Sequence, residues 1–176
     1  MTMRRIRFLI LGFLLLLVCG NASAGEASAL YSKALNAAKK GQKDIAFVHF
    51  SAILERHSGS KHTKNSLFGA GEYYYSISDY RDALPLFEQF VEDFPEAKGK
   101  LFALAYLYKL SKESERDGLV KKVRKEIITF KQQSFLFRVF KNYQYRSPLY
   151  LSHKAVYYID RVEFYIDDQL FAEIPF

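Results

Sequence analysis

Apolar residues recur at helical spacing over most of the chain and at every second position near its end. From Glu26 to about Lys131 they return every three or four residues, as on the buried side of an amphipathic helix. After residue 134 they alternate with polar residues, a pattern typical of strands with one buried face. The pattern predicts a mainly α fold, with a helical solenoid over 25–133 and a small antiparallel β segment over 134–176.

The helical part is predicted to consist of about three helix pairs. Tight turns are indicated at Gly41 and at Ser78-Asp79. Two windows superpose 37 residues apart and carry the same apolar face: Ala46, Phe50, Ile53 and Leu54 fall on Ala83, Phe87, Phe90 and Val91. Repeats of this length are typical of solenoids, in which each helix pair buries its apolar face against the next pair.

The middle pair resembles the tetratricopeptide repeat family. The matching positions, all between 64 and 97, are Leu67, Gly71, Tyr74, Ala83, Phe87 and Pro95. The segment DYRDALPLFEQFVEDFPEAK is also similar to bacterial envelope solenoids of the outer-membrane assembly lipoprotein and Tol–Pal-associated types. The resemblance implies a solenoid that binds other proteins.

The resemblance also implies that the first helix of each pair lines a concave groove. The candidate partner-binding positions on that face, with one flanking cation, are Tyr31, Leu35, Phe68, Glu72, Phe102, Tyr106 and Lys109. A row of aromatic side chains can clamp an extended or helical partner segment. The same aromatics can instead pack against neighbouring helices or the C-terminal segment, and the sequence leaves both arrangements open.

The alternating pattern predicts four strands. Two are expected over Phe135–Tyr145 and Leu149–Tyr158, and a hairpin over 162–166 and 170–174. Matching the apolar faces of the hairpin pairs Ile166 with Leu170 and Phe164 with Ala172. Because so small a sheet needs a neighbour to cover it, we expect it to lie against the last helices.

The N-terminus has the form of an export signal. Met1–Arg7 carries three arginines and no acid, and the apolar run over 8–18 has eleven residues, against the roughly 20 that span a bilayer. Ala22-Ser23-Ala24 matches a signal-peptidase site, which predicts a signal peptide over 1–24, cleavage after Ala24 and a periplasmic location. Lipid attachment at Cys19 is less favoured, because Val18 stands where a small residue is expected. An uncleaved membrane anchor is a further alternative.

Charge adds one candidate surface. The chain has 26 Lys and Arg against 19 Asp and Glu, a net charge of +7, and loss of the three signal arginines leaves +4. Basic residues gather on the last predicted helix at Lys121, Lys122, Arg124 and Lys125. This basic patch can meet an anionic membrane surface, acidic glycan or an acidic partner, or it can be the solvated outer side of a capping helix. Nucleic acid is not an expected partner of an exported protein.

The sequence holds no pattern of catalytic or metal-binding residues. Its single cysteine, Cys19, lies in the export signal, and no nucleophile elbow, phosphate loop or zinc motif is present. His49, His57, His62 and His153 do not have the spacing of a ligand set and are expected to be solvated or half-buried. We therefore expect no metal, no cofactor and no enzymatic activity.

These features favour a periplasmic adaptor or scaffold that binds a segment of another envelope protein in its groove. The alternative is a module that binds the cell wall or a glycan, with peptidoglycan sugars stacking on Tyr143, Tyr145, Tyr157 and Tyr165. In a third possibility, the free edge of the sheet adds to the sheet of a partner.

Overall fold

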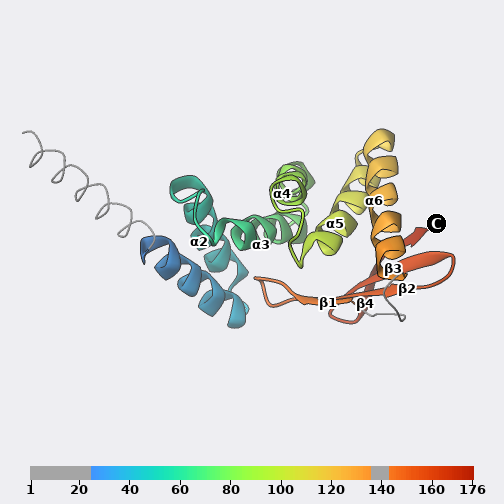
Figure 1. The fold of residues 1–176 in the computed structure, drawn as a ribbon. Helices are drawn as coiled ribbons and strands as arrows, with labels where there is room; N and C mark the ends of the chain where they lie inside the picture. The colour runs from blue at the N-terminus through green and yellow to red at the C-terminus, as the bar shows by residue number, and fades with distance from the viewer. Residues whose placement is uncertain (1–24, 136–142) are drawn as a thin grey trace, which may run out of the picture.

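The computed structural model describes residues 25–135 and 143–176. Within these ranges six helices precede one four-stranded sheet (Figure 1). The helices are residues 25–39, α2 (Lys43–Arg56), α3 (Thr63–Ser76), α4 (Tyr80–Asp93), α5 (Lys100–Glu113) and α6 (Asp117–Phe135). The mainly helical fold with a small antiparallel sheet is therefore confirmed. None of the helices in the described ranges has the length and apolar character needed to cross a membrane.

The predicted turns between paired helices are present. Gly41 and Ser78 adopt the left-handed backbone region, with φ of 75° and 63°, and each follows the first helix of a pair. Asp79 then caps α4, because its side chain accepts a hydrogen bond from the backbone N–H of Asp82 at 3.4 Å. Local turn and capping residues thus fix where α4 begins.

Two glycines of α3 allow its neighbours to pack closely. A Cβ at Gly69 would lie 2.7 Å from the ring of Phe50 in α2, and a Cβ at Gly71 would lie 3.0 Å from the ring of Phe87 in α4. Both rings are fully buried. Phe50 and Phe87 are equivalent positions in the two superposed windows, and α3 lies between them, with Gly69 against the ring of the preceding helix and Gly71 against that of the following helix.

The strands are β1 (Tyr143–Arg146), β2 (Ser152–Tyr157), β3 (Arg161–Ile166) and β4 (Gln169–Pro175), all antiparallel and in sequence order. The prediction of a strand beginning at Phe135 is wrong, because α6 continues to that residue. The remainder of that predicted strand before Tyr143 lies outside the described residues.

The last hairpin differs from its predicted register by one residue. Phe164 pairs with Ala172 as predicted, but Leu170 pairs with Tyr165 rather than with Ile166. Asp167 and Asp168 both have positive φ and form a two-residue turn, so β4 contains one extra residue, Phe171, as a bulge. The bulge leaves Leu170 58% exposed.

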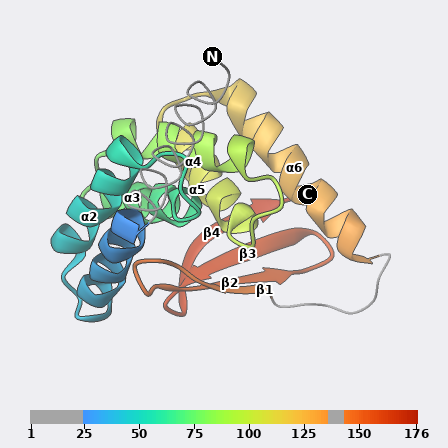
Figure 2. The same ribbon diagram turned by 60° about the vertical axis from the view of Figure 1, so that its left-hand side comes forward.

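The sheet lies under the arch of the helices, along their concave side (Figure 2). Its inward residues belong to the same core as α3, α4, α5 and α6; they are Ala155, Tyr157, Val162, Phe164 and Ile174. Leu149, in the loop after β1, is buried in a second cluster that includes Ala34 and Phe50. The expectation that the sheet covers the last helices is confirmed, and the loop after β1 reaches the first helix pair as well.

Candidate protein-binding groove

The middle of the predicted groove is filled by the chain's own sheet. Phe68 and Phe102 are at most 3% exposed. Their ring centroids lie 5.1 Å and 5.8 Å from that of Tyr145 in β1, and both rings also contact His153 in β2. These aromatics therefore pack against the C-terminal segment, which is one of the two arrangements that the sequence left open.

A buried polar cluster joins the groove to the sheet. Nε2 of His153 lies 2.6 Å from Oε1 of Glu72, with side-chain exposures of 2% and 0%. The hydroxyl of Tyr106 donates to the same carboxylate oxygen at 3.3 Å, and burial together with that carboxylate raises the pKa of Tyr106 well above its ordinary value. Since buried polar groups are costly unless they are hydrogen-bonded, the cluster favours one position of β2 over α3.

The burial of His153 corrects a prediction. From their spacing the histidines were expected to be solvated or half-buried, whereas His153 is 2% exposed. It occupies the inward side of β2 together with Ala155 and Tyr157, which are also buried. That alternation was the available signal, but its partner Glu72 lies 81 residues earlier, and strand periodicity carries no information about such a distant contact.

Lys109, predicted to flank the groove, and Arg124, predicted to belong to the basic patch, both bind the edge strand β4. Nζ of Lys109 donates to the carbonyl of Phe171 at 3.1 Å and lies 4.8 Å from the centre of its ring. Nε of Arg124 donates to the carbonyl of Pro175 at 2.8 Å. Because these carbonyls already accept side-chain hydrogen bonds, that edge of the sheet is partly protected against strand addition.

The N-terminal end of the groove remains open. Tyr31 and Leu35 are half-buried and line a cleft of about 290 Å³ between the first helix and the loop after β1. Its other lining residues are Asn65, Tyr145, Arg146, Ser147, Pro148 and Tyr150. The Asn65 side-chain amide donates to the Tyr31 hydroxyl at 2.7 Å, and the Tyr31 ring stacks on His62 with centroids 4.3 Å apart. The cleft thus offers aromatic walls in fixed positions.

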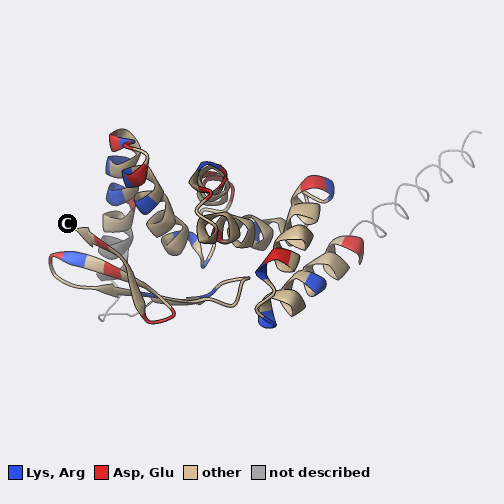
Figure 3. Ribbon diagram, turned by 180° about the vertical axis from the view of Figure 1, so that it is seen from behind, with Lys and Arg blue, Asp and Glu red and all other residues tan. Residues whose placement is uncertain are grey.

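One of the four residues of the basic patch contacts the sheet. Lys121, Lys122 and Lys125 are exposed, whereas Arg124 is half-buried against β4. Figure 3 shows the basic positions of α6 together with the acidic positions on neighbouring helices. Arg124 is therefore engaged by β4, while a basic surface formed by the three lysines stays a prediction.

The four tyrosines proposed for sugar stacking do not share a face. Tyr145 and Tyr157 pack inward, and burial raises the pKa of both. The Tyr165 hydroxyl donates to Oε2 of Glu163 at 2.6 Å, and this hydrogen bond raises the pKa of Tyr165 to about 12. Glu163 also accepts a hydrogen bond from Arg161 at 2.8 Å, so Tyr165 belongs to a polar network rather than to an aromatic platform.

Within the described ranges no three His, Cys, Asp or Glu side chains come together as a possible metal site. The features that the described residues do present are packing surfaces and clefts.

Stacked antiparallel helix pairs, with Phe50 and Phe87 buried at equivalent positions beside α3, define the chain as an α-solenoid of tetratricopeptide type. A family model described as outer membrane lipoprotein, YfiO, matches residues 23–150, and the chain belongs to this family. The match includes all six described helices and β1. No curated protein matches the sequence significantly. Membership confirms the resemblance to envelope solenoids and identifies the chain as a cell-envelope protein.

Proposed function

We propose that this protein is an envelope adaptor that holds a segment of another envelope protein at the open end of its groove. The cleft beside Tyr31 and Leu35 carries this proposal, because it is the stretch of the predicted groove that the sheet leaves accessible. The first helix and the loop after β1 build it together. A partner segment bound there would contact both parts of the fold.

The chemistry of the cleft fits a peptide anchor. Tyrosine and arginine are enriched among the side chains that contribute most to protein interfaces, and Tyr31, Tyr150 and Arg146 line this cleft. An apolar side chain of the partner would insert beside Leu35, while the exposed guanidinium of Arg146 would meet a carboxylate or a backbone carbonyl. No catalytic step is part of this proposal.

The alternative glycan-binding function receives less support. It needs several tyrosine rings presented side by side, and Tyr157 is only 7% exposed while Tyr165 is engaged by Glu163. The adaptor function needs only the cleft as it stands.

The proposal places the mature chain in the periplasm after cleavage behind Ala24. Membership of an outer membrane lipoprotein family makes lipid attachment at Cys19 the competing possibility, although the family match begins at residue 23. The Ala22-Ser23-Ala24 site and the valine before Cys19 favour cleavage without a lipid.

Site-specific photocrosslinking in intact cells tests the adaptor function. A photoreactive residue at Leu35 or Tyr150 should give a discrete crosslink to one envelope protein, and Arg146→Glu should reduce it several-fold. Matched probes at Val48, which is 60% exposed on α2, and at Phe68, which is fully buried, serve as controls. We expect neither of them to capture the partner.

Two outcomes count against the proposal. The absence of an intermolecular crosslink from both cleft positions would remove the assigned site. Capture of the partner from Phe68 would mean that the sheet leaves the groove and that the middle of the groove is the binding surface.

A further inference from the structure

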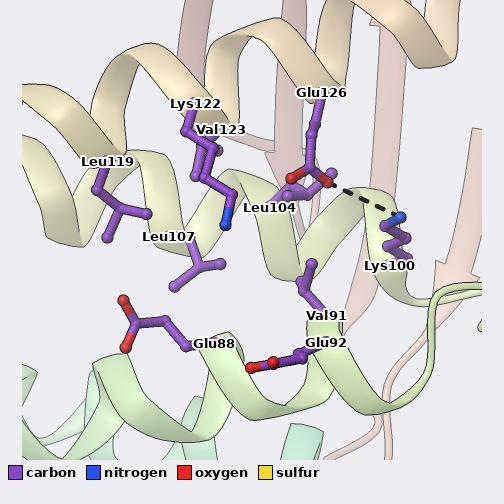
Figure 4. A pocket seen from close by; sticks show the side chains of 10 residues that line it. All are labelled: Glu88, Val91, Glu92, Lys100, Leu104, Leu107, Leu119, Lys122, Val123 and Glu126. Atoms are coloured by element: carbon purple, nitrogen blue, oxygen red, sulfur yellow. Dashed lines mark ion pairs between the residues drawn. The ribbon is translucent and has the colours of Figure 1, made fainter.

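A second cleft lies between α4 and α6, across the outer side of α5 (Figure 4). Its volume is about 430 Å³, within the range of typical ligand-binding clefts. The floor is Leu104 and Leu107, which are 1% and 3% exposed, and the walls carry Val91, Leu119 and Val123. This cleft shares no lining residue with the open end of the groove.

The two lips of the cleft carry opposite charge. Glu88 and Glu92 line it from α4, and Lys122 extends into it from α6 (Figure 4). Glu126 of α6 also lines the cleft, but its charge is paired with Lys100 of α5. Among the described residues, the charged side chains that line the cleft form the ion pairs Lys100–Glu126 and Arg116–Glu88, each with a nitrogen–oxygen distance of 3.8 Å. Lys122 and Glu92 therefore face each other across an apolar floor without forming an ion pair in the described structure.

The shape of the cleft favours a helix over a strand as its occupant. Both walls and the floor are helices, so the cleft has no strand edge with which an extended segment could pair its backbone. A helix satisfies its own backbone and packs by inserting a ridge of side chains between its neighbours. An apolar ridge fits Leu104 and Leu107, with a charged flank on each side.

We propose that the α4–α6 cleft binds an amphipathic helix of a second protein, with an apolar ridge, a basic flank against Glu88 and Glu92, and an acidic flank against Lys122. The opposite charges of the lips carry this choice, because a helix with like charges on both flanks would meet repulsion at one lip. Together with the open end of the groove, the chain has two binding surfaces and can link two partners.

Three synthetic peptides of equal length test the proposal with the full-length chain. All have a leucine ridge; one has lysines on one flank and glutamates on the other, one has glutamates on both flanks, and one has lysines on both. Fluorescence anisotropy of labelled peptides gives the dissociation constants. We expect the mixed-flank peptide to bind about tenfold more tightly than either of the others.

Charge reversals at the lips should weaken binding of the mixed-flank peptide and strengthen binding of one of the other two peptides. Glu88→Lys combined with Glu92→Lys makes both lips basic and should move the preference to the peptide with glutamates on both flanks. Lys122→Glu makes both lips acidic and should move it to the peptide with lysines on both flanks. Glu55→Lys and Lys33→Glu, at exposed positions away from the cleft, are matched controls and should leave the order of affinities unchanged.

A change of preference cannot arise from unfolding, so the reversals remain informative even if they lower stability. Equal binding of the three peptides, or no binding, would overturn the proposal. A preference that the reversals leave unchanged would also overturn it. Self-association of the chain that Glu88→Lys combined with Glu92→Lys abolishes would identify a second copy as the occupant and overturn the choice of a second protein.

Discussion

His153 in β2 and Glu72 in α3 form a buried contact of 2.6 Å between Nε2 and Oε1. It connects the C-terminal sheet to the helix at the centre of the solenoid, and Tyr106 of α5 donates to the same carboxylate. The other carboxylate oxygen of Glu72 has no hydrogen-bond partner among the described residues. The Glu72 side chain therefore depends on His153 and Tyr106 for its hydrogen bonding.

Removing either His153 or Glu72 should lower the free energy of unfolding by more than a substitution at an exposed position does. We expect His153→Ala and Glu72→Ala each to lower the free energy of unfolding by about 3 kcal/mol, because each leaves a buried polar group without its partner. Urea denaturation followed by circular dichroism measures this. The double variant should lose clearly less free energy of unfolding than the sum of the losses in the two single variants. Strictly additive losses would contradict a direct interaction between the two side chains. His49→Ala, at a half-buried position on α2, is the control.

Glycine-to-alanine substitutions in α3 and in α6 should have opposite effects on stability. Gly69→Ala should destabilise the protein by about 1–3 kcal/mol, because the new Cβ would lie 2.7 Å from the buried Phe50 ring. Gly118→Ala, in the first turn of α6 with nothing within 4 Å of the added Cβ, should be neutral or stabilising by up to about 1 kcal/mol. Thermal unfolding of the two variants is the measurement. Equal changes in the melting temperature would show that helix propensity, and not the contact with Phe50, determines the effect of both substitutions.

Local patterns predicted the elements of this fold, and contacts between distant residues determined what they do together. The spacing of Ala46, Phe50, Ala83 and Phe87 was enough to predict the repeated helix pair, because helical periodicity is a local property. The hairpin register was predicted at Phe164 and missed after it. A bulge changes which side chains point inward without changing the apolar composition of the strand.

The candidate site was predictable only in part. The helix face that carries Phe68 and Phe102 was identified from the repeat, and the sequence left open what covers it. That covering comes from Tyr145 and His153, whose positions depend on how the whole sheet docks. The burial of Glu72 and the cleft at Tyr31 follow from the same docking, so neither has a signal in the local sequence.

The outer face of the sheet predicts a specific loss of stability in acid. The hydrogen bond from Tyr165, and next that from Arg161, hold the pKa of Glu163 below its ordinary value of 4.5. A carboxyl group whose pKa is lower in the folded state adds stability above the unfolded pKa and loses it as the pH falls through the folded pKa. The stability difference between the natural chain and Glu163→Gln should therefore be constant down to about pH 5 and shrink at lower pH.

Urea midpoints measured between pH 7 and pH 3 test this dependence. Tyr165→Phe should weaken it, because the largest cause of the lowered pKa is removed. Glu55→Gln, an exposed carboxylate on α2, is the control. A difference between the natural chain and Glu163→Gln that does not change with pH would contradict the assignment.

The export signal predicts the mass of the mature chain. We expect the protein isolated from the envelope to begin at Gly25 and to carry no lipid, and Cys19→Ser to leave its mass and its fractionation unchanged. Replacing Ala22 and Ala24 with leucine should block cleavage and retain the longer chain. Intact mass spectrometry distinguishes the possibilities. A chain that begins at Cys19 with an attached diacylglycerol would establish the lipoprotein alternative.

Because the sheet and the helices share one core, we expect them to unfold together. Phe102 of α5 contacts Tyr145, His153 and Phe164 of three different strands, so Phe102→Ala should lower the free energy of unfolding by about 3–5 kcal/mol. If residues 143–176 are a structural part of the solenoid, helix and sheet should lose their structure at one denaturant concentration, in the natural chain and in the variant. Helical circular dichroism and hydrogen exchange of the β2 and β3 amides report the two parts separately. A sheet that opens at a lower concentration while the helices persist would identify it as a separate unit, able to leave Phe68 and Phe102 accessible to a partner.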